Sequence, residues 1–173
     1  MTENSAQPDQ FTGLILLTGS DSPGIAASLF KTLSPFAVHV LDIEQVVISD
    51  RLILTVLIGA NPAHQSAIEE DLNACAMNLD VDIATLFGNG PLSSIPHQLL
   101  EIHLSAEKLH PHSVALVSQV ISNAGANIER FVRTSATPIS ISITISGATK
   151  SEMDAAIDAL VFEHPTTVST KAI

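Results

Sequence analysis

The sequence predicts an α+β protein made of two βαββαβ units, each an antiparallel sheet with helices on one face. Three observations lead to this prediction. The pattern strand, helix, strand, strand, helix, strand occurs twice within the 173 residues. Several residue types recur in the two copies at nearly constant spacing. One break rich in Gly, Pro and Ser separates the copies at residues 88–98.

The first copy is expected within residues 13–88. Its apolar pattern begins as a continuous run, which predicts a strand buried on both faces, and then changes to the stripe of an amphipathic helix. Two β-rich runs joined by a hairpin turn follow, and then a helix with Asn61 as its cap and Pro62 at its first position. The segments are, in order, residues 14–17, 24–35, 38–48, 52–59, 61–79 and 80–87.

The second copy is expected within residues 99–173 and repeats this order, which is the ferredoxin-like arrangement. Its first helix is closed by Gly125 at the position after the C-cap. Its third strand alternates between isoleucine and Ser or Thr, which predicts one core face and one polar face. Units this small bury little apolar surface alone, so packing of two units or dimerisation is expected. The segments are, in order, residues 99–105, 117–124, 126–135, 139–145, 153–160 and 166–171.

The composition excludes several classes of function. A formal net charge of −11 repels phosphate backbones, and the aromatic residues, 3% of the chain, are all Phe, so nucleic acid is not an expected partner. No apolar run reaches the roughly 18 to 20 residues of a membrane helix. The polar N-terminus lacks signal-peptide features, so a cytoplasmic protein with a flexible tail over residues 1–12 is expected. Cys75 is alone, which excludes an internal disulfide and indicates a small core residue.

The junction between the first strand and the first helix is the strongest candidate site. The stretch LTGSDSPGIAASLF begins at Leu17, and the helical pattern follows directly on Asp21, Ser22, Pro23 and Gly24. Two interpretations stay open. The segment can be a plain turn with Asp21 as the helix N-cap, or the helix start can offer free N–H donors to an anion. Glycine suits the second because it lets a ligand approach the backbone.

Two βαββαβ units with Asp-x-Pro-Gly after the first strand, and Asp-Ile or Asn-Ile opening the second, resemble ACT domains, the small-molecule sensing modules of amino-acid metabolism. The resemblance covers residues 13 to about 171. It is greatest to the paired ACT domains that precede the catalytic domain of certain bacterial phosphoserine phosphatases. It implies ACT domains at residues 13–88 and 99–173 with a linker at residues 89–98. The segments that carry it are LTGSDSPGIAASLF, LDIEQVVISDRLILTVLI and GANIERF.

In ACT domains that bind amino acids, the ligand lies between the loop after the first strand and the start of the second strand of a partner unit. The resemblance therefore implies an amino-acid ligand, L-serine or glycine, whose ammonium group lies near Asp21 or Asp42. The matching loop of the second unit has Lys108 in place of the acid and Pro111 in place of the glycine, so it is not expected to bind in the same way. The implied ligand-binding residues are Asp21, Ser22, Pro23, Gly24, Ile25, Asp42, Ile43 and Asn127.

Catalytic residues, metal ions and cofactors are not expected. The sequence Asp80-Val81-Asp82 comes near the Asp-x-Asp motif of haloacid-dehalogenase phosphatases, but it falls at a helix–strand junction with no catalytic domain around it. His110 and His112 flank a proline and lack further ligands of the kind a metal site needs.

The expected function is an amino-acid-binding regulatory and dimerisation module without enzyme activity of its own. It would form a homodimer, either closed or exchanged through the linker, and it could be the N-terminal region of a phosphoserine phosphatase linked to a catalytic domain. The alternative is a stand-alone two-ACT regulator resembling the glycine cleavage system repressor, which would act through protein partners. A third possibility is a dimerisation unit whose ligand loop has decayed.

Overall fold

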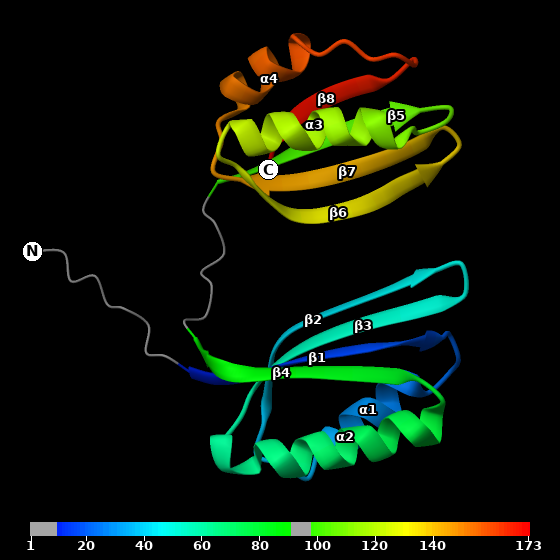
Figure 1. Ribbon diagram of the computed structural model, residues 1–173, viewed down its shortest axis with the longest axis vertical. Helices are drawn as coiled ribbons and strands as arrows, with labels where there is room; N and C mark the ends of the chain where they lie inside the picture. Colours follow the sequence, from blue (N-terminus) through cyan, green and yellow to red (C-terminus); the bar gives the residue numbers. More distant parts are fainter. Residues whose placement is uncertain (1–9, 91–97) are drawn as a thin grey trace, which may run out of the picture. The chain divides into compact units, whose positions relative to one another are not determined.

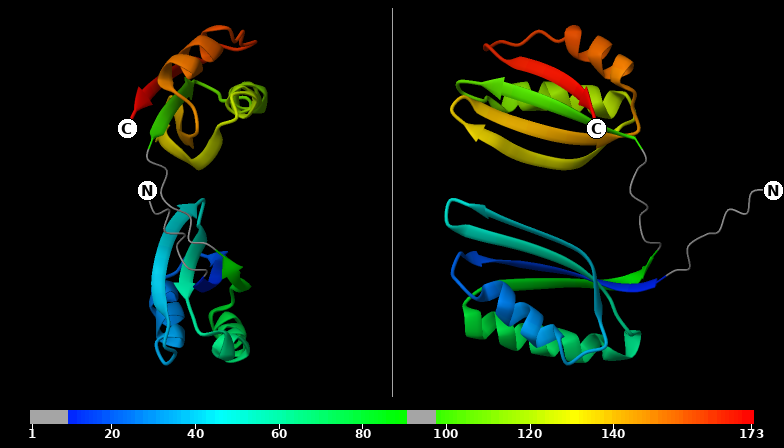
Figure 2. Two further views of the ribbon diagram at one scale, coloured as in Figure 1. Left: turned by 90° about the vertical axis from the view of Figure 1, so that its left-hand side faces the viewer. Right: turned by 180° about the vertical axis from the view of Figure 1, so that it is seen from behind.

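The computed structural model describes residues 10–90 and 98–173, and each range forms a compact unit (Figure 1). Each unit has a four-stranded antiparallel sheet with two α-helices on one face (Figure 2). The predicted fold class, two ferredoxin-like βαββαβ units, is confirmed. None of the helices in the described ranges is long and apolar enough to cross a membrane.

In the first unit, the strand order is β2-β3-β1-β4, so β1 and β3 are central and β2 and β4 are edge strands. β1 pairs antiparallel with both β3 and β4, and β2 pairs antiparallel with β3. The elements are β1 (Gln10–Ser20), α1 (Ile25–Leu33), β2 (His39–Ile48), β3 (Arg51–Gly59), the short 3₁₀ segment η1 (Pro62–His64), α2 (Gln65–Leu79) and β4 (Asp82–Gly90).

The second unit repeats this topology with the strand order β6-β7-β5-β8. β5 and β7 are central, and β6 and β8 are the edges. The elements are β5 (Leu99–Ala106), α3 (Pro111–Asn123), β6 (Asn127–Ala136), β7 (Ile139–Ser146), α4 (Lys150–Asp158) and β8 (Thr167–Ala172).

Most turn and cap residues act as their chemistry predicts. Ser49 and Asp50 join β2 to β3 with φ values of 45° and 65°, the left-handed pair of a type I′ hairpin turn. The Asn61 side chain accepts the N–H of Ala63 at 2.9 Å, and so caps η1, through which the chain enters α2. Gly125 follows the C-cap of α3 with a φ of 71°, as predicted.

Each unit has its own hydrophobic core between its sheet and its helices. The apolar stripes predicted for the four helices face these cores, and Cys75 is buried as a small core residue. β7 turns its alternate isoleucines into the second core, as its strict alternation predicts. Fully buried side chains include Ile15, Leu17, Leu29, Leu54 and Ile68 in the first unit and Ile102, Leu104, Val117, Ile143 and Met153 in the second.

The prediction that the apolar run of β1 is buried on both faces is wrong within the first unit, where only one face of β1 is covered. Ile15 and Leu17 are 0% exposed, but Leu14 and Leu16 are each 39% exposed. The reason is that both helices cover the same face of the antiparallel sheet, so the other face stays open. The first unit therefore presents an aliphatic open face.

The ends of the first unit extend beyond the predicted boundaries. β1 begins at Gln10, inside the segment expected as a tail, and β4 ends at Gly90, inside the segment expected as a linker. The start of β1 and the end of β4 pair with each other, since Gln10 lies opposite Gly90 in the sheet. Residues 1–9 and 91–97, which make up most of the expected tail and linker, lie outside the described residues.

Candidate functional site

The loop between β1 and α1 lines a cleft of about 380 Å³. Its walls are residues 21–27 together with Gln45 of β2 and Leu52 of β3. The chain enters α1 through Gly24, which is the N-cap residue and has a φ of 93°. Side chains with a Cβ rarely adopt this left-handed backbone, so the loop conformation favours glycine here. Of the two interpretations of this segment, the one with Asp21 as the N-cap does not hold, because the helix begins directly after Gly24 with no side-chain cap.

A backbone hydrogen bond holds this loop against the β2–β3 hairpin. The N–H of Asp21 donates to the carbonyl oxygen of Asp50 at 2.7 Å. Asp50 lies in the type I′ turn, which is the end of the hairpin that carries Gln45 and Leu52. The turn therefore positions the loop and the two hairpin residues around the same cleft.

The cleft offers complementary groups for a small zwitterion. The N–H groups of Ile25, Ala26 and Ala27 belong to the first turn of α1, where no intrahelical acceptor is available and the helix dipole favours negative charge. A ligand carboxylate fits this end. Asp21 supplies an exposed carboxylate for an ammonium group, and the amide of Gln45 can both donate and accept.

The structure brings together five of the eight predicted ligand-binding residues, namely those of the loop from Asp21 to Ile25. Asp42 and Ile43 lie on β2 but do not line this cleft, and the Asp42 carboxylate accepts the N–H of Ile43 at 2.8 Å. Asn127 belongs to the second unit, where its amide donates to Glu129 at 2.9 Å. Within the first unit, the cleft therefore contains the loop residues of the predicted set but neither Asp42 nor Ile43.

Sequence reasoning missed Gln45. In the sheet this residue lies opposite Leu54, which is buried on the helix-covered face, so both side chains share that face. A polar residue between Ile43 and Val47, which lie on the same helix-covered side of β2, is the signal that could have found it. Using that signal requires the register of β2 on β3, which the sequence pattern leaves open.

The matching loop of the second unit differs in its chemistry. α3 begins with Pro111 after the N-cap residue His110, so this helix start has neither the glycine nor the N–H that the first unit offers at that place. His110 stacks on His164 and not on its sequence neighbour His112. Within residues 10–90 and 98–173, no group of three or more His, Cys, Asp and Glu side chains could hold a metal ion.

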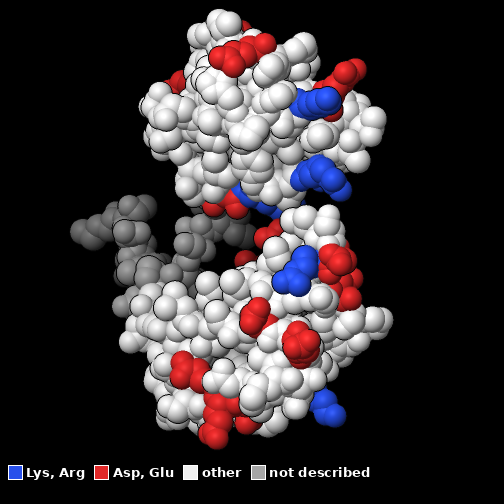
Figure 3. Space-filling model, turned by 45° about the vertical axis from the view of Figure 1, so that its right-hand side comes forward, with Lys and Arg blue, Asp and Glu red and all other residues white. Residues whose placement is uncertain are grey.

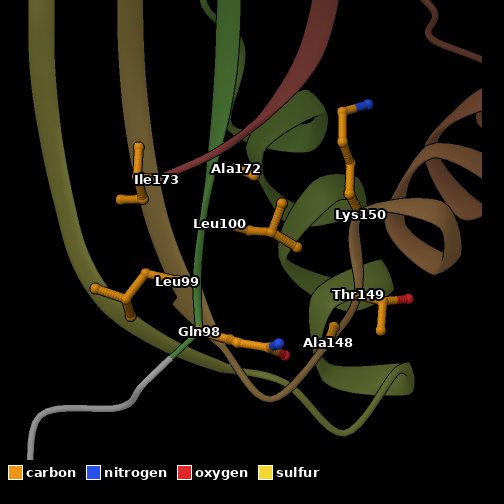
Figure 4. Close-up of a pocket in the computed structure, with 8 residues that line it drawn as sticks. All are labelled: Gln98, Leu99, Leu100, Ala148, Thr149, Lys150, Ala172 and Ile173. Carbon is orange, nitrogen blue, oxygen red and sulfur yellow. The ribbon is translucent and has the colours of Figure 1, made fainter.

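A smaller cleft of about 250 Å³ lies where β5 begins, lined by residues 98–100, 148–150 and 172–173 (Figure 4). Two of its polar side chains, Thr149 and Lys150, already form contacts at the start of α4. Thr149 forms a reciprocal capping box with Glu152, and this hydrogen bonding holds the pKa of the Glu152 carboxyl below its ordinary value. Lys150 extends away from Gln98 and pairs with Asp154. These contacts give the cleft a structural role.

The open face of the second sheet is polar and hydrogen-bonded. The buried Ser142 hydroxyl donates to Glu101 at 2.5 Å, and Glu101 also pairs with His103 at 3.1 Å. The serine hydrogen bond, followed by the nearby imidazole, lowers the pKa of the Glu101 carboxyl. Because the partner of the hydroxyl is a carboxylate and not an imidazole, this cluster lacks the arrangement that activates a serine nucleophile.

Acidic and basic side chains are not equally frequent on the surface. Acidic side chains are the more frequent on the visible face of the first unit, in line with the net charge of −11 (Figure 3). This surface disfavours polyanionic partners.

Comparison with known proteins shows which proteins this chain is similar to. Residues 12–85 match the family model for the ACT domain. A phosphoserine phosphatase of Streptomyces coelicolor is 30% identical over 150 residues, which cover 83% of this chain and 35% of that protein. The phosphoserine phosphatase SerB2 of Mycobacterium tuberculosis is 37% identical over 79 residues, which cover 44% of this chain and 19% of that protein. The chain thus matches about a third or less of these relatives.

Solved structures share the arrangement of elements over nearly the whole chain. A candidate glycine cleavage system transcriptional repressor has a TM-score of 0.75 at 15% identity, covering 95% of this chain and 98% of that one. A protein of unknown function from Galdieria sulphuraria has a TM-score of 0.73 at 14% identity, covering 96% and 99%. At such low identity these likenesses establish the fold alone. The first unit thus matches the ACT domain family over residues 12–85, and the second unit repeats the same βαββαβ fold.

Proposed function

We propose that this chain is an amino-acid-binding regulatory module, with L-serine as its first ligand to test, and that it has no enzyme activity of its own. The observation that carries the proposal is the β1–α1 cleft, which combines a helix start behind Gly24 with the carboxylate of Asp21 and the amide of Gln45. The match of residues 12–85 to the ACT domain and the names of the two phosphatase relatives support a ligand of serine metabolism.

The complete site is proposed to include β2 of a second copy. Asp42 and Ile43 do not line the cleft of their own chain, and they lie on β2, an edge strand of the first unit's sheet. Antiparallel pairing of two β2 strands about a twofold axis would place the Asp21 loop of one chain near the Asp42 segment of the other. If the ligand binds the dimer and the monomer with different affinities, ligand binding would then shift the equilibrium between these two states.

The edge strands of the two units differ in a way that favours β2 as this interface. β2 exposes aliphatic side chains on both of its faces, beside the acids Asp42 and Glu44, and has a single register shift, next to Val40. β6, the corresponding edge of the second unit, carries Glu129, Arg130 and Arg133 and has two register shifts, features that protect an edge from pairing. The exposed aliphatic residues of β2 are Val40, Ile43, Val46, Val47 and Ile48.

Two biological settings fit the same binding module. The relative from Streptomyces coelicolor is nearly three times as long as the matched region, which favours a regulatory region linked to a phosphatase domain. The candidate repressor is covered over 98% of its length, which favours a stand-alone two-unit regulator acting through protein partners. An in-frame Asp-x-Asp-x-Thr motif in the gene beyond Ile173 would identify the first setting.

Calorimetry with L-serine and glycine tests the proposal. We expect binding with a Kd in the micromolar to millimolar range, on the order of 4 to 8 kcal/mol. Gly24→Ala is expected to weaken it at least about tenfold, because a Cβ would stand between the ligand carboxylate and the helix start, and because alanine at a φ of 93° costs about 1 kcal/mol.

The matched control is Gly88→Ala. A Cβ at either glycine meets no protein atom within 4 Å, but only Gly24 has a left-handed backbone. Gly88→Ala is therefore expected to bind serine like the parent chain, with circular dichroism checking that both variants are folded. Absence of heat with any common amino acid would contradict the ligand proposal and leave the dimerisation-only alternative.

The purified chain is expected not to hydrolyse O-phosphoserine, with or without magnesium. Asp80 is the C-cap residue of α2 with a left-handed φ of 53°, and Asp82 begins β4, so the Asp-x-Asp sequence forms a helix–strand junction. Release of inorganic phosphate is the measurement. Turnover that disappears in Asp80→Asn would overturn the regulatory assignment.

A further inference from the structure

The second unit has a cleft of its own, of about 860 Å³, formed by the β5–α3 loop, the turn at Pro138 and the segment that precedes β8. Its ionisable lining residues are Glu107, Lys108, His110 and His164. It occupies the place that the β1–α1 cleft has in the first unit, but its charged groups differ, since a lysine stands where the first unit has Asp21. Its ligand must differ as well.

Two imidazole rings are stacked in this cleft. The ring centroids of His110 and His164 are 3.9 Å apart, and their planes differ by 22°. Hydrogen bonds hold the two segments together, because the Thr166 hydroxyl donates to the His164 carbonyl oxygen at 3.0 Å and accepts from the buried Ser113 at 3.3 Å. The segment that carries His164 is therefore tied to α3, which follows directly on His110.

Charge in the cleft depends on these imidazoles. The ionisable groups on its segments are Glu107 and Lys108 before α3, His112 within its first turn, and Glu163 beside His164, while the turn at Pro138 adds none. With neutral imidazoles, two acids oppose one base. With His110 and His164 protonated, two acids would oppose three cations, so protonation of the pair would reverse the sign of the charge.

Two imidazolium rings at the separation of His110 and His164 would repel each other, and an anion beside them would offset that repulsion. Imidazolium and ammonium groups are donors that suit the oxygens of a tetrahedral anion. We propose that the cleft binds a small oxyanion of the sulfate or phosphate type through Lys108, His110 and His164, and that this binding is coupled to protonation of the stacked pair. The proposal is independent of the amino-acid site in the first unit.

Sulfate binding to the whole chain, measured by calorimetry at about pH 6 and about pH 8, tests the proposal. Sulfate carries the same charge at both pH values, so a change in its affinity must come from a change in the protonation of the protein. We expect binding to be at least about tenfold tighter at the lower pH. By reciprocity, sulfate is expected to move the NMR titration midpoints of the His110 and His164 rings to higher pH and to leave that of His39 in place.

The variants His110→Gln and His164→Gln are each expected to remove most of the pH dependence, and Lys108→Gln to weaken binding at both pH values. His112→Gln is the matched control, because His112 is exposed on the same segment but does not line the cleft. It is expected to change the affinity by less than about twofold. Circular dichroism checks that all four variants are folded.

Equal sulfate affinity at the two pH values would overturn the proposal, as would retention of the pH dependence in both imidazole variants. A loss of affinity in His112→Gln equal to that in His164→Gln would also overturn it, because a diffuse charge effect would then explain the binding. The anion could be a free ion or the phosphate of a monoester, and O-phosphoserine in place of sulfate separates the two. If O-phosphoserine binds more tightly than sulfate, the ligand is assigned as a phosphate monoester. If the two bind equally, the ligand is assigned as the free anion.

Discussion

Leu54→Ala is expected to lower the free energy of unfolding of the first unit by about 3 to 4 kcal/mol while the second unit stays folded. Leu54 is fully buried at the centre of β3, opposite Gln45 of β2 and Leu17 of β1. The neighbouring strands are tied by hydrogen bonds, so they cannot collapse onto the vacated volume. A small domain has about 5 to 15 kcal/mol of stability in all, so this change removes much of it.

Urea unfolding, followed through amide NMR signals of each unit separately, measures this effect. The two cores share no residue, so we expect the midpoint of the first unit alone to fall. The control is Met77→Ala on α2, whose side chain is 78% exposed, and we expect it to change the free energy of unfolding by less than about 0.5 kcal/mol. An equal fall for both units would contradict their independence.

The double variant Val46→Lys/Val47→Lys is expected to convert a homodimer into a monomer and to raise its dissociation constant at least about a hundredfold. Val46 lies opposite Ile53 on the open face of the sheet, and Val47 lies opposite the buried Leu52 on the helix face. The two lysines therefore place charge on both sides of the β2 edge. Both valines are largely exposed, 41% and 46%, so the unit itself is expected to stay folded.

Light scattering at micromolar concentration is the measurement, and a monomer has a mass of 18.2 kDa. Phe131→Lys is the control, because it places a lysine at a partly exposed apolar position (43%) of β6, an edge strand of the second unit. We expect this variant to remain a dimer. A monomeric parent chain would contradict the homodimer, and a monomeric Phe131→Lys variant would assign the interface to the second unit.

The same double variant also tests whether a second copy completes the ligand site. Neither valine lines the β1–α1 cleft, so a site built by one chain would keep its affinity for serine. Loss of serine binding together with dimerisation is the result expected if Asp42 and Ile43 act from the partner. Dimer loss with unchanged serine affinity would restrict the site to the residues of a single first unit.

Local patterns in the sequence predicted most of the secondary structure, because each pattern depends on interactions between residues that are close in the sequence. Helical stripes marked the buried faces of the helices, and the alternation of β7 marked its core face. The left-handed pair Ser49 and Asp50 formed the expected hairpin turn. The Asp-x-Pro-Gly sequence located the cleft, although the backbone uses Gly24 and not Asp21 to begin the helix.

By itself the sequence determined the two-unit fold, the helix and strand order and the position of the β1–α1 loop, since periodicity, turns and caps act over short distances. Only the tertiary structure decided which distant segments meet. The register of β2 on β3 directs Gln45 toward the cleft, the placement of both helices on one face leaves Leu14 and Leu16 open, and the packing of two loops stacks His110 on His164. A pattern along the chain shows which residues share a face, whereas the packing of separate segments determines what covers that face.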